Sequence, residues 1–412
     1  SAMVFYGWWM ILVMDIIYMI HSGLWYYGLS AFIIPLTQEF GWTRTEISLG
    51  ISLSKVDSGV DGPIVGWMSD HIGTRWTTIF CLAISGVLFI SLSLINSLWS
   101  FYALMLIIFV LPTSPFTAMA TAVAQWFDRK AGTAMGLYSI GGALTGLISP
   151  VLVWIIVNYG WRTACTLAGT FILLCIPLSF TIKNYGPEHY GLLPDGEVKE
   201  EKSNPQRYTR VPDPAQRETL REFTLREALK DKSYWLITIA YSLSNFATQA
   251  IILHLLPHLI NIGFEPGLAA LGMTIVTLSS ALGRFGFGWL GDIFKKRYVF
   301  ALSFAIMLVG CIAFTNASAP WAVFLALATF GPGMGGMFVS RISIQREYYG
   351  REHWGITQGF LMLMSSVPTF LGPIYAGWMF DNYGSYVPAF MPLTLLWITA
   401  IVLMVMARPP QR

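Results

Sequence analysis

Long runs of hydrophobic residues follow one another along the whole chain, separated by short stretches of polar residues, glycine and proline. An apolar helix of about 20 residues crosses the ~30 Å hydrocarbon core of a bilayer. Runs of that size cover residues 7–36, 46–69, 76–95, 98–126, 131–157, 161–182, 234–262, 266–291, 298–314, 320–345, 355–380 and 386–407. The pattern predicts an all-α membrane protein with twelve transmembrane helices.

The lysines and arginines are distributed unevenly between the two sides of these predicted helices. Almost all fall in alternate loops, whereas Arg44 and Arg162 fall in loops of the other side, and Lys55 and Arg284 lie within predicted helices. Cationic loops stay in the cytoplasm. We therefore expect a multi-pass protein of the plasma (inner) membrane with both termini and the long central loop in the cytoplasm.

The central loop differs in composition from the rest of the chain. Residues 183–233 are densely charged, contain five prolines and show almost no apolar periodicity. This composition predicts a cytoplasmic linker between an N-terminal six-helix bundle, residues 1–182, and a C-terminal six-helix bundle, residues 234–412.

The two halves contain a repeated motif. The sequence "GWMSDHIGTR" after the second predicted helix matches "GWLGDIFKKR" after the eighth with a constant offset. The same offset aligns Pro35 with Pro257 and Gly41 with Gly263, and "NYG" recurs at residues 158 and 382. Landmarks in register indicate two duplicated bundles, and parallel repeats are typical of transporters that rock about a site between their halves.

These "G-x-x-x-D-x-x-x-x-R" loops resemble the signature of the major facilitator superfamily. Further stretches resemble its monocarboxylate-transporter and oxalate/formate-antiporter branch: "YGWW" at residues 6–9, "QWFDRKAGTAMGLYSIGGALTG" at 125–146, "YGLLPDG" in the linker, and "GRFGFGWLGD" around Arg284. Three features depart from that branch. The first helix lacks the lysine of monocarboxylate transporters, Ser280 replaces their aspartate, and residues 355–380 lack the lysine of the antiporters.

The resemblance implies the major facilitator fold, with two pseudo-symmetric six-helix bundles and a gating role for the repeated loops. Glycines of the motif would permit close helix approach, and its aspartates would hold helix ends and loop arginines together when the other side is open. The residues concerned are Gly66, Asp70, Arg75, Gly288, Asp292 and Arg297.

Arg284 is a permanent charge inside an apolar run. Such a residue is costly near the bilayer centre, and it normally faces a cavity or a partner. Thr277, Ser280 and Arg284 share one helical face, and a guanidinium suits a carboxylate ligand. We expect Arg284 and Ser280 to bind an organic anion; the alternative is a structural ion pair between Arg284 and a carboxylate of the second helix.

The second predicted helix carries Lys55, Asp57 and Asp61. Asp57 and Asp61 share a face, and two close carboxyls in a low-dielectric site resist joint ionisation, so one of them would hold a proton. We expect this group to couple transport to protons. The alternative is that these residues form ion pairs, with Lys55 and with Arg284, that only pack the halves together.

Two further helices present polar stripes that would line a central cavity. Tyr18 and Ser22 in the first helix, and Asn245 and Gln249 in the seventh, are candidate substrate hydrogen-bonding groups, with interhelical polar contacts as the alternative. His21 is a candidate proton relay, although a single histidine in a helix is also compatible with a packing role.

Composition narrows the class of function. Of 412 residues, 55% are hydrophobic and 11% charged, which excludes an ordinary soluble domain. No nucleophile elbow, phosphate loop or metal-ligand cluster occurs, so we expect neither an enzyme nor a bound cofactor or metal. We expect as partners a small organic anion, a proton and the lipid bilayer, with no nucleic acid, and a functional monomer.

The leading hypothesis is therefore a proton-coupled symporter of a small organic monocarboxylate. Three alternatives remain open: an exchanger of carboxylates or dicarboxylates without net proton movement, a proton-coupled exporter of cationic or amphipathic compounds, and a substrate sensor built on a transporter scaffold.

Overall fold

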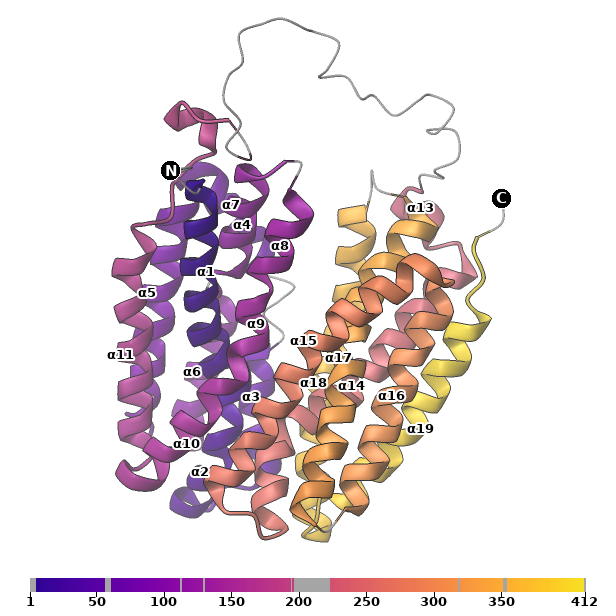
Figure 1. Ribbon diagram of the computed structural model, residues 1–412. Coiled ribbons are helices and arrows are strands. Elements are labelled where there is room, and N and C mark those ends of the chain that lie inside the picture. The colour runs from indigo at the N-terminus through magenta and orange to yellow at the C-terminus, as the bar shows by residue number, and fades with distance from the viewer. Residues whose placement is uncertain are drawn as a thin grey trace, which may run out of the picture.

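The computed structural model describes residues 5–55, 61–111, 113–128, 130–193, 195, 223–317, 319–350 and 354–410. The described residues are helical apart from short connections, and they include ten helices long and apolar enough to cross a membrane. Figure 1 shows these helices gathered into two bundles that stand side by side. The predicted all-α membrane fold is confirmed.

The first bundle is built from residues before the linker. Its α-helices are α1 (Tyr6–Ser22), α2 (Ile33–Phe40), α3 (Arg44–Lys55), α4 (Asp61–Ile72), α5 (Thr74–Leu92), α6 (Leu98–Val110), α7 (Phe116–Trp126), α8 (Ala131–Tyr138), α9 (Ile140–Leu144), α10 (Ile148–Tyr159) and α11 (Trp161–Ser179). Short irregular turns join some of them: η1 (Gly23–Tyr27) and η2 (Gly28–Phe32) connect α1 to α2, and η4 (Thr145–Leu147) connects α9 to α10.

Two predicted helices of this bundle are not continuous in the described residues. The predicted helix 46–69 corresponds to α3 and α4, with residues 56–60 outside the description, and the predicted helix 98–126 corresponds to α6 and α7. Pro115 precedes α7 as its N-cap residue, and a proline lacks the N–H that would continue the preceding helix. The predicted count of twelve helices is therefore not fully confirmed.

The second bundle contains six long helices. They are α14 (Lys232–Asn261), α15 (Pro266–Ile293), α16 (Lys296–Asn316), α17 (Pro320–Tyr349), α18 (Trp354–Tyr383) and α19 (Val387–Met406). Prolines occupy the first turn of α15, α17 and α19, where the missing N–H costs nothing because it would have no helical partner.

Backbone geometry supports the internal duplication. Gly41 ends α2 with φ +70°, and its repeat partner Gly263 follows α14 with φ +102°. The two "NYG" glycines behave alike: Gly160 has φ +83° after α10, and Gly384 has φ +66° after α18. Residues other than glycine rarely adopt these angles. The repeated glycines therefore reverse the chain at corresponding places in the two halves.

Both described ends of the linker pack onto the bundle next to them. Before the gap, Trp126 Nε1 donates to the carbonyl of Tyr185 at 3.0 Å, beside η5 (Pro187–Tyr190). After the gap, the backbone N–H of Phe223 donates to the carbonyl of Tyr349 at 3.1 Å, next to α13 (Leu225–Ala228). The end of the molecule that holds η5, α13 and both described chain ends is called the terminal side below, and the other end the opposite side.

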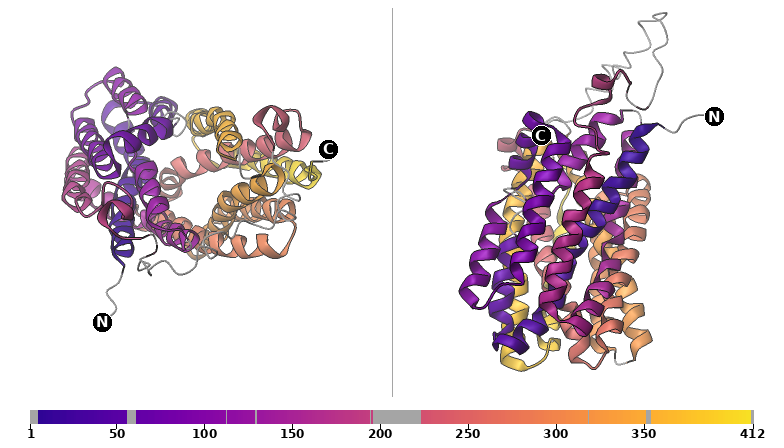
Figure 2. Two further views of the ribbon diagram at one scale, coloured as in Figure 1. Left: turned by 90° about the horizontal axis from the view of Figure 1, so that it is seen from above. Right: turned by 90° about the vertical axis from the view of Figure 1, so that its left-hand side faces the viewer.

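The two bundles are in contact at one end of the molecule and are apart at the other. Across the interface, α3 packs against α18 and α10 packs against α15. Figure 1 shows the ribbons converging on the opposite side and diverging towards the terminal side, and the left view of Figure 2 looks down between the two bundles. The cavity of the candidate site lies between the two bundles.

Candidate functional site

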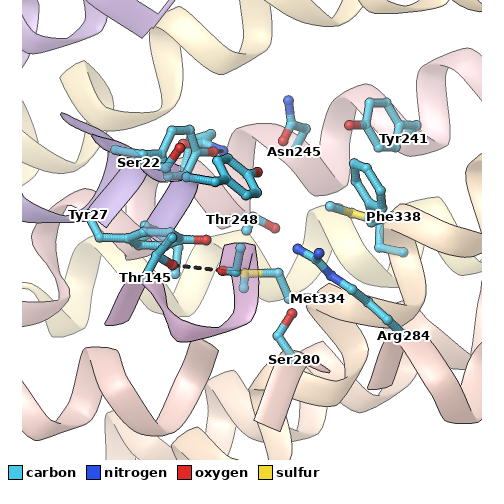
Figure 3. Close-up of a pocket in the computed structure, with 16 residues that line it drawn as sticks. Ser22, Tyr27, Thr145, Tyr241, Asn245, Thr248, Ser280, Arg284, Met334 and Phe338 are labelled. Carbon is cyan, nitrogen blue, oxygen red and sulfur yellow. Dashed lines mark hydrogen bonds between the residues drawn. The ribbon is translucent and has the colours of Figure 1, made fainter. Parts of the chain in front are cut away.

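A cavity of about 220 Å³ lies between the two bundles. Both bundles contribute side chains to it (Figure 3). The lining residues are Tyr18, Ser22, Tyr26, Tyr27, Gly142, Thr145, Tyr241, Asn245, Thr248, Gln249, Ile252, Ser280, Arg284, Met334, Met337 and Phe338. Hydroxyl, amide and aromatic groups therefore surround one permanently charged side chain.

That charged side chain is Arg284 of α15. Figure 3 shows its guanidinium reaching into the cavity, with Phe338 at its side and Ser280 one turn away. The guanidinium carbon lies 5.1 Å from the centre of the Phe338 ring, and Nε is buried without a hydrogen-bond partner. The ion pairs between described residues are Arg162–Glu39 and Lys296–Glu347. Arg284 thus faces the cavity without a described counter-charge.

The predicted polar residues of α1 line the same cavity. Tyr18 packs its ring against Phe116 and Tyr138, with ring centres 5.1 and 5.7 Å away, and Ser22 lies one turn further along α1. Packing of this kind fixes the position of the Tyr18 hydroxyl. The helix α1 therefore contributes two hydroxyl-bearing side chains to the cavity lining.

The predicted amides of α14 line the cavity and make direct contacts. Asn245 donates through its side-chain nitrogen to the Thr369 hydroxyl within the second bundle. Gln249 donates to the Tyr26 hydroxyl of the first bundle, while its amide oxygen is buried without a partner. Gln249 thus joins the two halves and leaves one acceptor free. The sequence predicted either a position in the cavity lining or a contact between helices, and Gln249 has both.

Of the four residues predicted to couple transport to protons, the structure describes the side chain of His21 alone. His21 is 5% exposed but is absent from the cavity lining, and its Nε2 has no hydrogen-bond partner. Its side chain therefore does not line this cavity, and its role as a proton relay stays a prediction. Asp57 and the side chains of Lys55 and Asp61 lie outside the described residues; α3 ends at Lys55 and α4 begins at Asp61.

A carboxylate near the cavity that the described structure does place is Asp15 of α1. Its side chain accepts a hydrogen bond from the backbone N–H of Gly141 at 3.0 Å. Gly141 follows the break between α8 and α9, and a Cβ there would lie 2.6 Å from the Asp15 carbonyl oxygen. Asp15 therefore holds α9, which belongs to the predicted helix 131–157, against α1.

Asp381 of α18 joins the bundles on the opposite side. Its carboxylate accepts from the backbone N–H of Arg44 at 3.0 Å, from the backbone N–H of Thr45 at 2.8 Å and from the Thr45 hydroxyl at 2.5 Å. These donors form the first turn of α3, where a negative charge is favoured. One helix is thus capped by a residue of the other bundle.

Arg44 and His254 extend this contact. The Arg44 guanidinium donates to the Tyr386 hydroxyl at 2.6 Å and lies 4.1 Å from the centre of the Phe380 ring. The Tyr386 hydroxyl also lies 3.0 Å from Nδ1 of His254. The other ring nitrogen of His254, Nε2, lies 3.0 Å from the Ser48 hydroxyl of α3. We call Arg44, Thr45, Ser48, His254, Asp381 and Tyr386 the latch. It closes the opposite side.

The repeated loop motifs lie on the terminal side, where the bundles are apart. Asp70 and Asp292 are exposed, and neither belongs to an ion pair between described residues. Arg75 Nε donates to the Ile182 carbonyl at 2.7 Å, and Arg297 donates to the Tyr298 hydroxyl at 2.9 Å. Among the described residues, the hydrogen-bond partners of these arginines belong to their own bundles.

The glycines of the motif do not mark close helix contacts in this conformation. A Cβ placed on Gly66 would meet no heavy atom within 4 Å, and one on Gly288 would meet only Val339 at 4.0 Å. Among the described residues, the close approach implied by the resemblance is therefore not seen at either glycine in this conformation.

Sequence reasoning missed Arg341. This residue of α17 lies within the predicted helix 320–345, although the charge pattern assigns only Lys55 and Arg284 to predicted helices. It is 3% exposed, and its guanidinium carbon lies 5.0 Å from the Tyr241 ring centre and 5.4 Å from that of Phe338. The signal available in the sequence was its place inside an apolar span.

Comparison with protein families and curated proteins points to one class. A family model described as the Major Facilitator Superfamily matches residues 14–275 and 255–412. Monocarboxylate transporter 12 of Rattus norvegicus is 26% identical over 323 residues, covering 74% of this chain and 64% of the relative. Monocarboxylate transporter 13 of Bos taurus is 25% identical over 279 residues, covering 67% and 60%. The chain thus matches a little less than two thirds of the length of these relatives.

Solved structures share the fold over almost the whole chain. A bacterial homologue of the human lysosomal transporter Spinster, in an inward-facing and unoccupied conformation, superposes with a TM-score of 0.70 at 14% identity, covering 98% of this chain and 95% of that one. A mutant of the nucleoside transporter NupG superposes with a TM-score of 0.69 at 13% identity, covering 97% and 98%. At these identities the likeness is one of fold.

Proposed function

Because this chain belongs to the major facilitator superfamily, we propose that it moves a small organic monocarboxylate across the membrane together with a proton. It is a multi-pass membrane transporter related to the monocarboxylate transporters, and not an enzyme. The substrate, the proton and the alternating-access cycle described below are the proposal.

The observation that carries the proposal is Arg284. A guanidinium that cannot deprotonate faces a cavity of about 220 Å³ between the bundles, without an ion pair to any described residue. Such a charge is stabilised by an anion that it can bind through two parallel N–H donors. The size of the cavity suits a small anion, and Tyr18, Ser22, Ser280, Asn245 and Gln249 supply hydrogen-bonding groups for its other oxygens.

The two sides of the interface supply the gates. The latch holds the opposite side closed, and the repeated loop motifs lie apart on the terminal side. If the terminal side is cytoplasmic, as the positive-inside rule predicts, this conformation is open to the cytoplasm. Closure of that side would bring Asp70, Arg75, Asp292 and Arg297 to the interface and would break the latch.

Proton coupling is assigned to Asp57 and Asp61, with Lys55 beside them. A proton shared between the two carboxyls neutralises one negative charge. The positive charge of Arg284 opposes this protonation, and a bound substrate anion offsets that charge, so proton binding and anion binding favour each other. Loading both ligands would thus leave the central region nearly neutral, which favours its passage through the closed intermediate.

The relatives agree with this class of substrate. Several of the curated proteins matched by this chain are named monocarboxylate transporters, and their matches span both bundles. The likeness covers only part of their length, so the substrate assignment rests on the cavity and on the following experiment.

Uptake into proteoliposomes tests the proposal. The purified protein is reconstituted, and uptake of radiolabelled lactate, pyruvate and acetate is measured with and without an inward proton gradient. We expect uptake of at least one of them to be accelerated by the gradient. Absent uptake, or uptake that ignores the gradient, would contradict the proposal; uptake only against an internal carboxylate would identify the exchanger instead.

A further inference from the structure

We propose that Arg341, together with Gln345 and Gln358, forms a second anion site that receives the substrate carboxylate from Arg284 on its way to the terminal side. The proposal rests on the proposed function in one respect, that the substrate is a carboxylate. It adds to that function a defined step of substrate passage within the second bundle.

The described partners of Arg341 are all neutral. Its guanidinium donates to the Met362 sulfur and lies against the rings of Tyr241 and Phe338. In the amide orientation that satisfies both side chains, the Gln358 oxygen accepts from its two terminal nitrogens at 2.9 and 3.2 Å. No described carboxylate forms an ion pair with it. A charge buried to 3% exposure without a counter-charge is strongly disfavoured unless an anion joins it.

The site retains unused donors. Arg341 Nε has no hydrogen-bond partner, and neither has the side-chain nitrogen of Gln345, which is fully buried one turn further along α17. Buried donors without acceptors are rare in folded proteins. Here the two unused donors are Nε of the buried guanidinium itself and the nearby Gln345 nitrogen. Together they suit a carboxylate, which only accepts hydrogen bonds.

The position of the site suits substrate passage. A Cβ on Gly335 would lie 3.0 Å from the Arg284 nitrogen, so Arg284 is level with Gly335. Arg341 comes six residues later on α17, which at 1.5 Å per residue places it about 9 Å nearer the terminal side. The helix continues in that direction to Tyr349, which contacts the linker end. The second site therefore lies beyond the cavity, towards the open side.

The Phe338 ring contacts both guanidinium groups. Its ring centre is 5.1 Å from the guanidinium carbon of Arg284 and 5.4 Å from that of Arg341, and the ring is partly exposed to the cavity. An anion that leaves Arg284 on this side meets Phe338 and then Arg341. A change in the Phe338 side-chain rotamer would connect the sites, because the ring is not fully buried.

The test measures exchange and stability in the same set of variants. Arg341→Met removes the charge, Arg341→Lys keeps it, and Arg346→Met removes an exposed arginine of the same helix as a control. Lactate exchange is measured in proteoliposomes, and melting temperature is measured in detergent without carboxylate.

We expect Arg341→Met to exchange lactate about tenfold more slowly, with half-saturation within twofold of wild type, and to melt at or above the wild-type temperature because an unpaired buried charge is gone. Arg341→Lys should keep more than half of the rate, and Arg346→Met all of it. Exchange of Arg341→Met at the wild-type rate, or melting well below wild type, would overturn the proposal. If wild type exchanges no lactate, the proposed function fails. The melting temperature of Arg341→Met then still tests the second site, because a value well below wild type would contradict an unpaired buried charge.

Discussion

At the scale of single residues, two arginines of the second bundle set the charge around the cavity. Arg284 faces it directly, and Arg341 lies behind the rings of Tyr241 and Phe338. Two permanent cations without described counter-charges favour anions over cations in this part of the protein. This distinguishes the proposed carboxylate transporter from an exporter of cationic compounds.

Proton coupling gives a prediction at this scale. Asp57→Asn or Asp61→Asn should abolish the acceleration of lactate uptake by an inward proton gradient and should leave lactate exchange within about threefold of wild type, because exchange needs no net proton movement. Gradient-driven uptake and exchange measured in parallel check this.

Asp15→Asn is the matched control for these two variants. An asparagine oxygen still accepts the hydrogen bond from Gly141, so both activities should stay within about twofold of wild type. Loss of gradient-driven uptake in Asp15→Asn alone, with Asp57→Asn and Asp61→Asn still coupled, would place the proton carrier in α1.

These residues could be predicted only where the local sequence around them carried the signal, without knowledge of which distant segments pack against them. Arg284 was predictable because a charge in the middle of an apolar run has few structural explanations. Arg341 was missed because its burial depends on Tyr241 of α14 and Gln358 of α18, which are distant in sequence. The sequence did not show that His21 is buried outside the cavity lining, because a helical stripe does not reveal which neighbouring helix covers its edge.

At the scale of helices, the latch couples α3 to α18 through a helix N-terminus. The carboxylate of Asp381 satisfies backbone donors that the first turn of α3 cannot use internally. The contact can form only when the bundles meet on the opposite side. It therefore stabilises one conformation of the transporter and not the other.

Asp381→Asn should weaken this conformation. The variant keeps an acceptor but loses the charge that favours the α3 N-terminus, worth about 1 kcal/mol, so the population open on the opposite side should rise about fivefold. Spin labels on Gln38→Cys and Asn382→Cys, both exposed, report the separation of the bundles. The four native cysteines are buried and should not react with the label. An unchanged distance distribution would contradict the role of the latch.

Gly146 permits a further contact between the bundles. The Thr274 hydroxyl donates to its carbonyl at 2.7 Å, and a Cβ on Gly146 would lie 1.9 Å from the Thr277 hydroxyl oxygen. Gly146→Ala should push η4 away from α15, at a cost of about 1–3 kcal/mol, and broaden the same label distances.

Gly136→Ala is the control for this substitution. Gly136 belongs to α8 of the same predicted span, and a Cβ there meets no heavy atom within 4 Å. Its distance distribution should match wild type. Equal broadening in the two variants would show that Gly146 acts through the span as a whole and not through its contact with α15.

The helices themselves were largely predictable, since each long apolar run forms helix. Their interruptions were not. The irregular turns η1 and η2 fall inside the predicted first helix because Gly23 and Gly28 pack against Ile148 and Leu152 of α10. Hydrophobicity along the chain carries no information about such close contacts. The latch was hidden for the same reason, because Arg44 and Asp381 are polar residues of predicted loop ends.

At the scale of the whole molecule, two duplicated bundles enclose a site that is not duplicated. The backbone turns of the halves correspond, as Gly41 and Gly263 show, whereas the position that corresponds to Arg284 in the first half is Gly62. In the proposed cycle, the symmetry would serve the rocking motion, and the asymmetry would place the proposed anion-binding charge of Arg284 in one bundle only.

Lactate exchange in proteoliposomes, compared between wild type, Arg284→Gln and Arg162→Gln, tests the central claim most directly. Arg162 is an arginine paired with Glu39 away from the cavity, so its substitution controls for loss of any arginine. We predict that Arg284→Gln exchanges lactate roughly 100-fold more slowly, as expected for loss of about 3 kcal/mol of charge-assisted hydrogen bonding, while Arg162→Gln keeps wild-type exchange. Exchange by Arg284→Gln at the wild-type rate would contradict the account.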